Sequence, residues 1–174
     1  MTAEPITGTI YTTYFSSPAG LLRLKGTDEF VTELFFCDET EAAHQANASQ
    51  EISPVLRQCM QELNEYFEGE RKEFTVPVNQ PGTTFQQAVW QQLLAIPYGT
   101  TISYLELSRR MGNVKAIRAA AASNGKNKIA VIVPCHRVIG SNRAMTGYAG
   151  GISRKIWLLQ HEATFSNEPQ TLFS

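Results

Sequence analysis

The sequence predicts an α/β N-terminal domain followed by a mainly α C-terminal domain with a helix-turn-helix pattern. Near the N-terminus, short runs rich in β-branched and aromatic residues alternate with turn residues, and an amphipathic helix follows them. The second half contains two short helical segments around a glycine turn. The charge also changes sign, because residues 1–82 have a net charge of −8 and residues 83–174 a net charge of +7.

The composition is that of a globular protein inside the cell. The chain has 174 residues, of which 43% are hydrophobic, enough to bury a sizeable core. No apolar run approaches the roughly 18 residues of a membrane span, and residues 1–10 lack the pattern of a signal peptide. Three widely spaced cysteines favour free thiols over disulfides. We therefore expect a monomer in the cytoplasm, or in the nucleus of a eukaryote, with no membrane association.

The N-terminal domain is expected to contain a small sheet and one helix. Strands are predicted at 8–15, 21–25 and 30–36, with turns at 18–20 and 26–28 and a polar loop at 37–50. Ser53 and Pro54 are typical of a helix start, and Gly69 of its end. Apolar residues between them follow one helical face, which includes Cys59. We interpret Cys59 and Cys37 as structural thiols.

A linker rich in proline is expected to separate the two domains. Residues 75–84 contain two prolines and a glycine at the point where the charge changes sign. We therefore divide the chain into domains at 1–78 and 83–174. Thr84 and Gln87 have the spacing of a capping box at the start of the next helix.

The second half continues with a helix pair and a final helix. Ser103 is the predicted N-cap of a helix over 104–111, Gly112 and Asn113 form the turn, and a second helix covers 114–123. A glycine-rich loop is expected over 140–151. It has two possible interpretations, an ordinary turn or the lining of a pocket for a base. Ser153 is expected to cap a final helix that ends near Glu162.

The basic residues of the second half indicate a polyanion-binding surface. All ten lie between Arg109 and Lys155, and no acidic residue occurs from Leu107 to His161. A helix pair alone is a weak signal, because many such pairs only pack against each other. Here the second helix and its flanks carry basic and small residues that favour DNA as the partner: Lys115, Arg118, Ala119 and Lys126.

Cys135 is the candidate nucleophile. The apolar run from Ile129 to Val133 is interpreted as a buried strand that ends at Pro134. A lone cysteine is usually a small core residue, but His136 and Arg137 are costly neighbours for a core thiol. Beside them, its pKa could fall below the usual value of about 8.5. On a regular strand His136 would point away from Cys135, so either the backbone turns here or a water links the two side chains.

We expect no metal and no cofactor. The sequence has no Cys-x-x-Cys, no His-Glu-x-x-His and no phosphate-binding glycine loop. Adjacent Cys135 and His136 have the wrong spacing for zinc ligands, and His44 and His161 stand alone.

The run from Ile132 to Ile139, Ile-Val-Pro-Cys-His-Arg-Val-Ile, resembles the active-site sequence of the O6-alkylguanine-DNA alkyltransferases, also called methylated-DNA:protein-cysteine methyltransferases. The motif is highly specific, and the resemblance extends over residues 83–162. The N-terminal half is similar in pattern and length only. The resemblance implies a ribonuclease-H-like sheet and helix domain, then a winged-helix-like domain that binds the minor groove of double-stranded DNA bearing O6-alkylguanine.

The resemblance also implies roles for the reacting residues. Cys135 would accept the alkyl group as a thioether, once per molecule, without a cofactor. His136 would take the thiol proton through a water, and Glu162 would orient and stabilise that imidazole. Tyr104 would donate toward guanine N3 as the base leaves. The expected substrates are O6-methylguanine and O4-methylthymine.

Other positions match family residues that handle the flipped nucleotide. Arg118 aligns with the arginine that fills the gap left in the duplex. Asn127 aligns with a hinge asparagine that ties the recognition helix to the active-site segment. Val138, Tyr148 and Ala149 fall on the base pocket, where the Val138 carbonyl would accept from the guanine amine. Ser103 is placed with the DNA-binding residues.

The sequence departs from the commonest family pattern at three positions. Lys128 replaces a proline, Ala149 stands where a serine is common, and Asn124 stands where an apolar residue is frequent. Two other functions stay open. A damage-recognition protein of the alkyltransferase-like class would lack the acceptor that Cys135 supplies, and a cysteine hydrolase would need a histidine brought from elsewhere in the fold.

Overall fold

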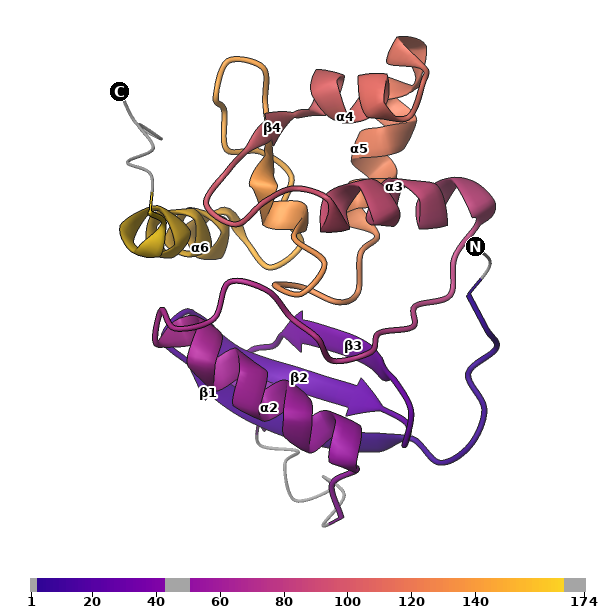
Figure 1. Cartoon of the computed structure of the whole chain (residues 1–174), viewed down its shortest axis with the longest axis vertical. Helices are drawn as coiled ribbons and strands as arrows, with labels where there is room; N and C mark the ends of the chain where they lie inside the picture. Colours follow the sequence, from indigo (N-terminus) through magenta and orange to yellow (C-terminus); the bar gives the residue numbers. More distant parts are fainter. Residues whose placement is uncertain (1–2, 43–50, 168–174) are drawn as a thin grey trace. The chain divides into compact units, whose positions relative to one another are not determined.

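The computed structural model describes residues 3–42 and 51–167, which form two compact units (Figure 1). The first unit contains residues 3–81 together with Lys128–Ala130, and the second contains Gly82–Asn127 and the chain from Val131 onward. The first unit is a sheet with a helix and the second is mainly helical, which confirms the predicted fold class.

The first unit is a three-stranded antiparallel sheet with one long helix (Figure 1). The strands are β1 (Tyr11–Ser17), β2 (Gly20–Gly26) and β3 (Val31–Phe36), in the order β1-β2-β3, and α2 (Pro54–Phe67) packs against all three. Buried side chains from both layers form the core: Leu22, Leu24, Leu34, Leu56, Leu63 and Tyr66. Ser53 caps α2 through the Leu56 N–H, as predicted.

A buried carboxylate anchors the chain that follows α2. Glu62 is 3% exposed and accepts hydrogen bonds from the backbone N–H groups of Thr75 and Val76, from the Thr75 hydroxyl and from the Gln58 amide. A buried carboxylate with this many donors is fully compensated for its lost hydration. Glu62 therefore fixes the extended segment beside the helix.

The second unit consists of short helices joined by a minimal parallel ladder. Its elements are α3 (Thr84–Leu94), β4 (Ile102–Ser103), α4 (Tyr104–Arg110), η2 (Val114–Ala116), α5 (Ile117–Gly125), η3 (Cys135–Arg137), β5 (Val138–Ile139) and α6 (Ile152–Phe165). Ile102 and Ser103 pair in parallel with Val138 and Ile139. The indole N–H of Trp90 in α3 donates to the Ser123 carbonyl at 2.9 Å, which fixes α5 against α3.

The predicted strand over Ile129–Val133 is wrong. The segment is buried, but only Ile129 makes a bridge, with Leu34 of β3, and Val131 has a φ of +68°. A β-branched residue in the left-handed region cannot continue a strand. The chain instead turns here, so that Lys128–Ala130 belongs to the first unit and Val131 to the second.

Several boundaries also differ from the predictions. The capping box is formed by Thr83 and Gln86, one residue before the expected pair Thr84 and Gln87. The final helix begins after Gly151 and not after Ser153. The second helix of the pair starts as the 3₁₀ turn η2 before α5, and α1 (Glu39–Ala42) occupies part of the expected 37–50 loop. Residues 43–50, including His44, lie outside the described residues.

Candidate active site

The backbone turns at Pro134 and places Cys135 at the start of the short helix η3. This turn removes the objection that holds for a regular strand, because successive side chains of a 3₁₀ helix do not alternate between opposite faces. The thiol is 6% exposed, and its Sγ accepts a hydrogen bond from the Asn127 amide at 3.2 Å. The same amide nitrogen donates to the Val133 carbonyl at 2.9 Å, so Asn127 ties the end of α5 to the acceptor segment.

His136 and Arg137, which follow Cys135 in η3, form a buried cluster with Glu162 of α6. The His136 Nε2 lies 2.8 Å from the Glu162 Oε1, and both side chains are at most 1% exposed. The guanidinium of Arg137 donates to both oxygens of Glu162, each at 2.9 Å, and to the Ile96 carbonyl at 2.7 Å. The N–H of Gly99 also donates to Glu162. The carboxylate is thereby held in one orientation.

The cluster determines which nitrogen of His136 can take a proton. Burial by itself would raise the pKa of the Glu162 carboxyl, but His136 and Arg137 hold it well below its ordinary range. Glu162 is then an acceptor only, so the neutral imidazole carries its hydrogen on Nε2 and presents a lone pair on Nδ1. Nδ1 is buried and has no hydrogen-bond partner in the described part of the chain. His136 is therefore arranged as a proton acceptor.

The structure corrects the expected pKa of the acceptor. Burial raises the pKa of the Cys135 thiol above its ordinary value, although the Asn127 hydrogen bond and the charge of Lys155 act in the opposite direction. Burial, together with the charges of Arg137 and Lys155, likewise lowers the pKa of His136, although Glu162 acts in the opposite direction. At neutral pH the resting pair is consequently a thiol beside a neutral imidazole, and a base must remove the thiol proton during the reaction.

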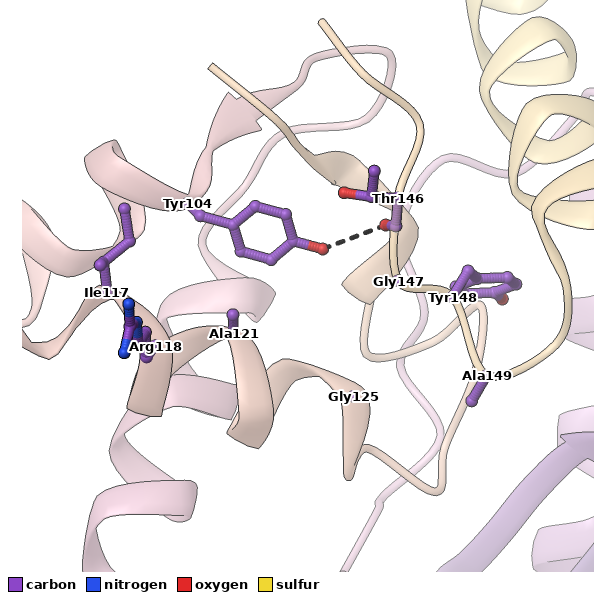
Figure 2. Close-up of a pocket in the computed structure, with 9 residues that line it drawn as sticks. All are labelled: Tyr104, Ile117, Arg118, Ala121, Gly125, Thr146, Gly147, Tyr148 and Ala149. Carbon is purple, nitrogen blue, oxygen red and sulfur yellow. Dashed lines mark hydrogen bonds between the residues drawn. The ribbon is translucent and has the colours of Figure 1, made fainter. Parts of the chain in front are cut away.

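A cavity of about 700 Å³ opens between α4, α5 and the loop that follows β5 (Figure 2). Nine residues line it: Tyr104, Ile117, Arg118, Ala121, Gly125, Thr146, Gly147, Tyr148 and Ala149. Tyr104 extends from α4 toward the loop, and its hydroxyl donates to the Thr146 carbonyl at 3.3 Å. Arg118 and Ile117 lie on the α5 side, and Tyr148 and Ala149 on the loop side. Burial, and after it the charge of a Cys135 thiolate, raises the pKa of both Tyr104 and Tyr148, which line this cavity.

Lys155 was not among the site residues that the sequence predicted. This fully buried lysine of α6 donates to the carbonyls of Val138, at 2.6 Å, and Thr146, at 3.0 Å. Burial lowers the pKa of Lys155 to about 8, and the thiolate charge of Cys135 raises it. Its nitrogen lies 5.9 Å from the centroid of the Tyr104 ring. Lys155 thus joins the glycine-rich loop at Thr146 to β5. No local sequence pattern predicts these contacts, because the three residues are far apart in the chain.

The exposed side of α5 carries the other predicted DNA-binding residues. Lys115, Arg118, Ala119 and Lys126 are all exposed, whereas Ala120, Ser123 and Asn124 are buried. Ser103 is half-buried, and its hydroxyl accepts the Glu106 N–H as the N-cap of α4. Val138 is buried and does not line the cavity, and one lone pair of its carbonyl is occupied by Lys155.

Neither a metal-ion site nor a membrane-spanning helix occurs in the part of the chain that the structure describes. Within residues 3–42 and 51–167, no three His, Cys, Asp or Glu side chains are grouped so that they could hold a metal ion. None of the helices in that part of the chain has the length and apolar character needed to cross a bilayer.

A buried thiol followed by an imidazole that a carboxylate holds, in one unit with a cavity and a basic helix of a helix-turn-helix pair, is typical of proteins that act on DNA through a cysteine. The chain belongs to the 6-O-methylguanine DNA methyltransferase family. Residues 84–164 match the family's DNA binding domain and residues 10–80 match its ribonuclease-like domain. These matches confirm the resemblance inferred from the motif around Cys135.

Relatives and solved structures agree over nearly the whole chain. The constitutive methylated-DNA–protein-cysteine methyltransferase of Bacillus subtilis is 42% identical over 156 residues, which cover 87% of this chain and 94% of the relative. The crystal structure of Mycobacterium tuberculosis O6-methylguanine methyltransferase is 39% identical, with a TM-score of 0.79 over 95% of this chain and all of that one. A structure of Mycobacterium tuberculosis OGT in complex with DNA is 42% identical, with a TM-score of 0.77 over 92% of this chain and 98% of that one.

Proposed function

We propose that this protein repairs DNA by transferring the alkyl group of O6-methylguanine in duplex DNA irreversibly to its own Cys135. The observation that carries the proposal is the setting of Cys135, whose buried thiol accepts a hydrogen bond from Asn127 and is followed directly in η3 by the His136 that pairs with Glu162, in the unit whose cavity is bordered by the basic helix α5. Relatives about 40% identical over most of the chain are methylated-DNA–protein-cysteine methyltransferases. Each molecule would act once, because the carbon–sulfur bond of the alkylated Cys135 does not break again under these conditions.

The chemistry begins with the proton of the thiol. His136 accepts it at Nδ1, directly or through a water, while Glu162 stabilises the imidazolium that forms. The thiolate attacks the alkyl carbon, a carbon–sulfur bond forms and the bond from carbon to O6 breaks. The electron pair passes to the base, and Tyr104 donates its phenolic proton at N3, so that the repaired guanine leaves without net charge.

Binding requires the damaged nucleotide to leave the duplex. Arg118, exposed at the start of α5 and also at the edge of the cavity, fills the gap in the base stack. Lys115 and Lys126 contact phosphates, and Ala119 allows close approach of the helix. Val138, Tyr148 and Ala149 surround the base, and Ser103 positions the start of α4 near the DNA.

The proposal extends to the setting in which the protein works. We place it as a monomer in the cytoplasm, or in the nucleus of a eukaryote, because Cys37, Cys59 and Cys135 are free thiols and suit a reducing compartment. We keep the division into domains at 1–78 and 83–174. O4-methylthymine is the second expected substrate, since it also carries its methyl group on a ring carbonyl oxygen.

Intact-protein mass spectrometry tests the transfer. The protein is incubated with a duplex that contains one O6-methylguanine, and Cys135→Ala is treated in parallel. We expect one stoichiometric gain, corresponding to a methyl group in place of a hydrogen, that maps to Cys135 and is absent from the variant. Tight binding to the lesion without any gain would instead support a damage-recognition protein, and repeated turnover of a thioester or amide substrate would support a hydrolase.

A further inference from the structure

Arg137 is a buried cation to which the proposed mechanism gives no step. It is 6% exposed, and its Nε and Nη2 donate to the two oxygens of Glu162, each at 2.9 Å. Its Nη1 donates to the Ile96 carbonyl at 2.7 Å, and the guanidinium carbon lies 5.7 Å from the centroid of the Tyr98 ring. Each nitrogen of the guanidinium therefore has an acceptor, and two of them hold the carboxylate in a bidentate ion pair.

The stability of the fold does not account for this ion pair. The lost hydration of two buried ions offsets much of their attraction, and apolar side chains of the same volume often replace such a pair without loss. In this protein the carboxylate has a second partner. The Oε1 of Glu162 that accepts from Arg137 also lies 2.8 Å from the His136 Nε2. The charge of Arg137 thus acts directly on the carboxylate that contacts His136.

The surroundings of His136 fit a neutral imidazole. A protonated ring carries a hydrogen on both nitrogens. Nδ1 is buried and has no hydrogen-bond partner among the residues that the structure describes, so a hydrogen there would be buried without an acceptor. Glu162 by itself would favour the protonated ring, because a buried carboxylate in contact with an imidazole stabilises the imidazolium. Another charge must offset this attraction if the resting ring is to accept a proton.

Two elements supply the titratable groups that adjoin or act on His136: Cys135 and Arg137 of η3, and Lys155 and Glu162 of α6. Lys155 acts in the same direction as Arg137, but it donates to two backbone carbonyls. Tyr98, beside Arg137, stays neutral because burial raises its pKa to about 12. Arg137 binds both oxygens of Glu162, and this ion pair carries no net charge.

We propose that Arg137 is a positioning residue that acts through Glu162, because its ion pair with this carboxylate leaves His136 neutral at rest and able to accept the Cys135 proton. The inference rests on the proposed function, in which His136 is the base. In that step the thiol proton moves from Sγ to Nδ1, directly or through a water, and the thiolate then takes the alkyl carbon from O6. Arg137 keeps its own protons throughout.

Single-turnover rates with O6-benzylguanine from pH 5.5 to 9 test the role of this charge. Arg137→Met removes the cation, and Arg71→Met is the matched control, because Arg71 also pairs with a glutamate, Glu65, but in the first unit. Without the cation Glu162 retains a proton on His136, which must leave before the ring can act as a base. The ratio of the Arg137→Met rate to the wild-type rate should therefore rise at least tenfold from pH 6.5 to pH 8.5. The ratio for Arg71→Met should stay constant.

Nitrogen NMR of the imidazole rings gives a readout that does not depend on transfer. The chain has three histidines, and the signals of His136 are those missing from His136→Asn. At pH 7 we expect a neutral ring with its hydrogen on Nε2 in wild type and in Arg137→Lys, which keeps the charge. Arg137→Met should show an imidazolium. Arg137→Gln, whose amide can still donate to Glu162, should behave in the same way and takes the place of Arg137→Met if that variant does not fold.

The inference is overturned if the ratio of variant to wild-type rate is the same at every pH, which is the result of a merely structural role. A neutral His136 ring at pH 7 in folded Arg137→Met or Arg137→Gln would overturn it too, as would an imidazolium in wild type. If wild type transfers no alkyl group while the rings behave as expected, the proposed function is wrong and the effect of Arg137 on His136 stands.

Discussion

Burial sets the protonation state of the two reacting side chains. The Cys135 thiol has a raised pKa and the His136 imidazole a lowered one, so the resting site holds no charge on either group at neutral pH. The presence of a nucleophile could be predicted from Pro134-Cys135-His136-Arg137, because such neighbours are unsuited to a core thiol. The direction of its pKa could not, because the burial and the Asn127 hydrogen bond arise from distant parts of the chain.

The rate of transfer to a free substrate is expected to be independent of pH between 6.5 and 8. Across this window the thiol stays protonated and the imidazole stays neutral, and Lys155, whose pKa is about 8, stays mostly charged except near the upper end. Below 6.5 the rate should fall only once the lowered pKa of His136 is reached, because a protonated imidazole cannot accept the thiol proton.

Single-turnover rates with O6-benzylguanine at several pH values measure this profile without a contribution from DNA binding. His136→Asn is the control, and its rate should rise with pH because only solvent can then ionise the thiol. A wild-type rate that climbs tenfold per pH unit across the window would show that His136 does not act as the base.

Replacing Arg143 with glycine is expected to stabilise the fold. Arg143 has a φ of +61°, a left-handed conformation that costs a residue with a Cβ about 1–2 kcal/mol. Glycine removes that cost but loses more entropy on folding, so the net gain is about 0.5–1 kcal/mol. Denaturant unfolding measures the difference. Gly147→Ala in the same loop, at a φ of +65°, should shift the midpoint in the opposite direction. A lower midpoint for Arg143→Gly would mean that its side chain stabilises the loop by more than the backbone strain costs.

At the level of elements, local capping signals predicted most helices correctly, whereas the apolar run Ile129–Val133 led to a wrong prediction of a strand. Ser53 and Ser103 cap the helices expected of them, because an N-cap depends on a few adjacent residues. The run Ile129–Val133 has strand composition, yet tertiary contacts turn it at Val131. Short apolar runs are ambiguous for this reason, since burial alone does not determine backbone conformation. The basic side of α5 was predictable from charge, whereas the buried position of Asn124 was not.

Arg118→Ala is expected to impair repair of duplex DNA much more than reaction with the free base. Only the duplex requires the nucleotide to be extruded, at a cost of a few kcal/mol, so a loss of about tenfold or more is expected there. Rates with an O6-methylguanine duplex and with O6-benzylguanine are compared. Lys115→Ala, two positions before α5 and equally exposed, is the matched control. The Lys115→Ala variant should bind the duplex more weakly. The slope of log affinity against log salt concentration should also become less steep by about one. Equal losses for Arg118→Ala on both substrates would contradict its role in the duplex.

At the scale of the whole molecule, both units contain a buried carboxylate that many donors hold ionised. Glu62 ties residues 75 and 76 to α2 in the first unit, and Glu162 joins α6 to η3 in the second. Burial alone would raise the pKa of each, but hydrogen bonds from Thr75 and Gln58 lower that of Glu62, and His136 and Arg137 lower that of Glu162. The charge asymmetry along the sequence does not indicate either group, because Glu62 depends mainly on Thr75 and Val76, and Glu162 on His136 and Arg137, all more than ten residues away.

These two carboxylates predict that the protein loses stability in acid. A carboxyl whose pKa is lower in the folded state stabilises that state above its unfolded pKa, near 4.5, and the stabilisation is lost as the pH falls below that value. Each such group contributes a slope of about 1.4 kcal/mol per pH unit between its unfolded and folded pKa values.

The free energy of unfolding is measured by urea denaturation from pH 7 to pH 3, for wild type and for Glu62→Gln. At pH 7 the variant should be less stable, because an amide cannot accept all four hydrogen bonds equally well. Below 4.5 its stability should decline less steeply than that of wild type, since it has one titrating group fewer. Parallel pH profiles would show that folding does not lower the pKa of the Glu62 carboxyl.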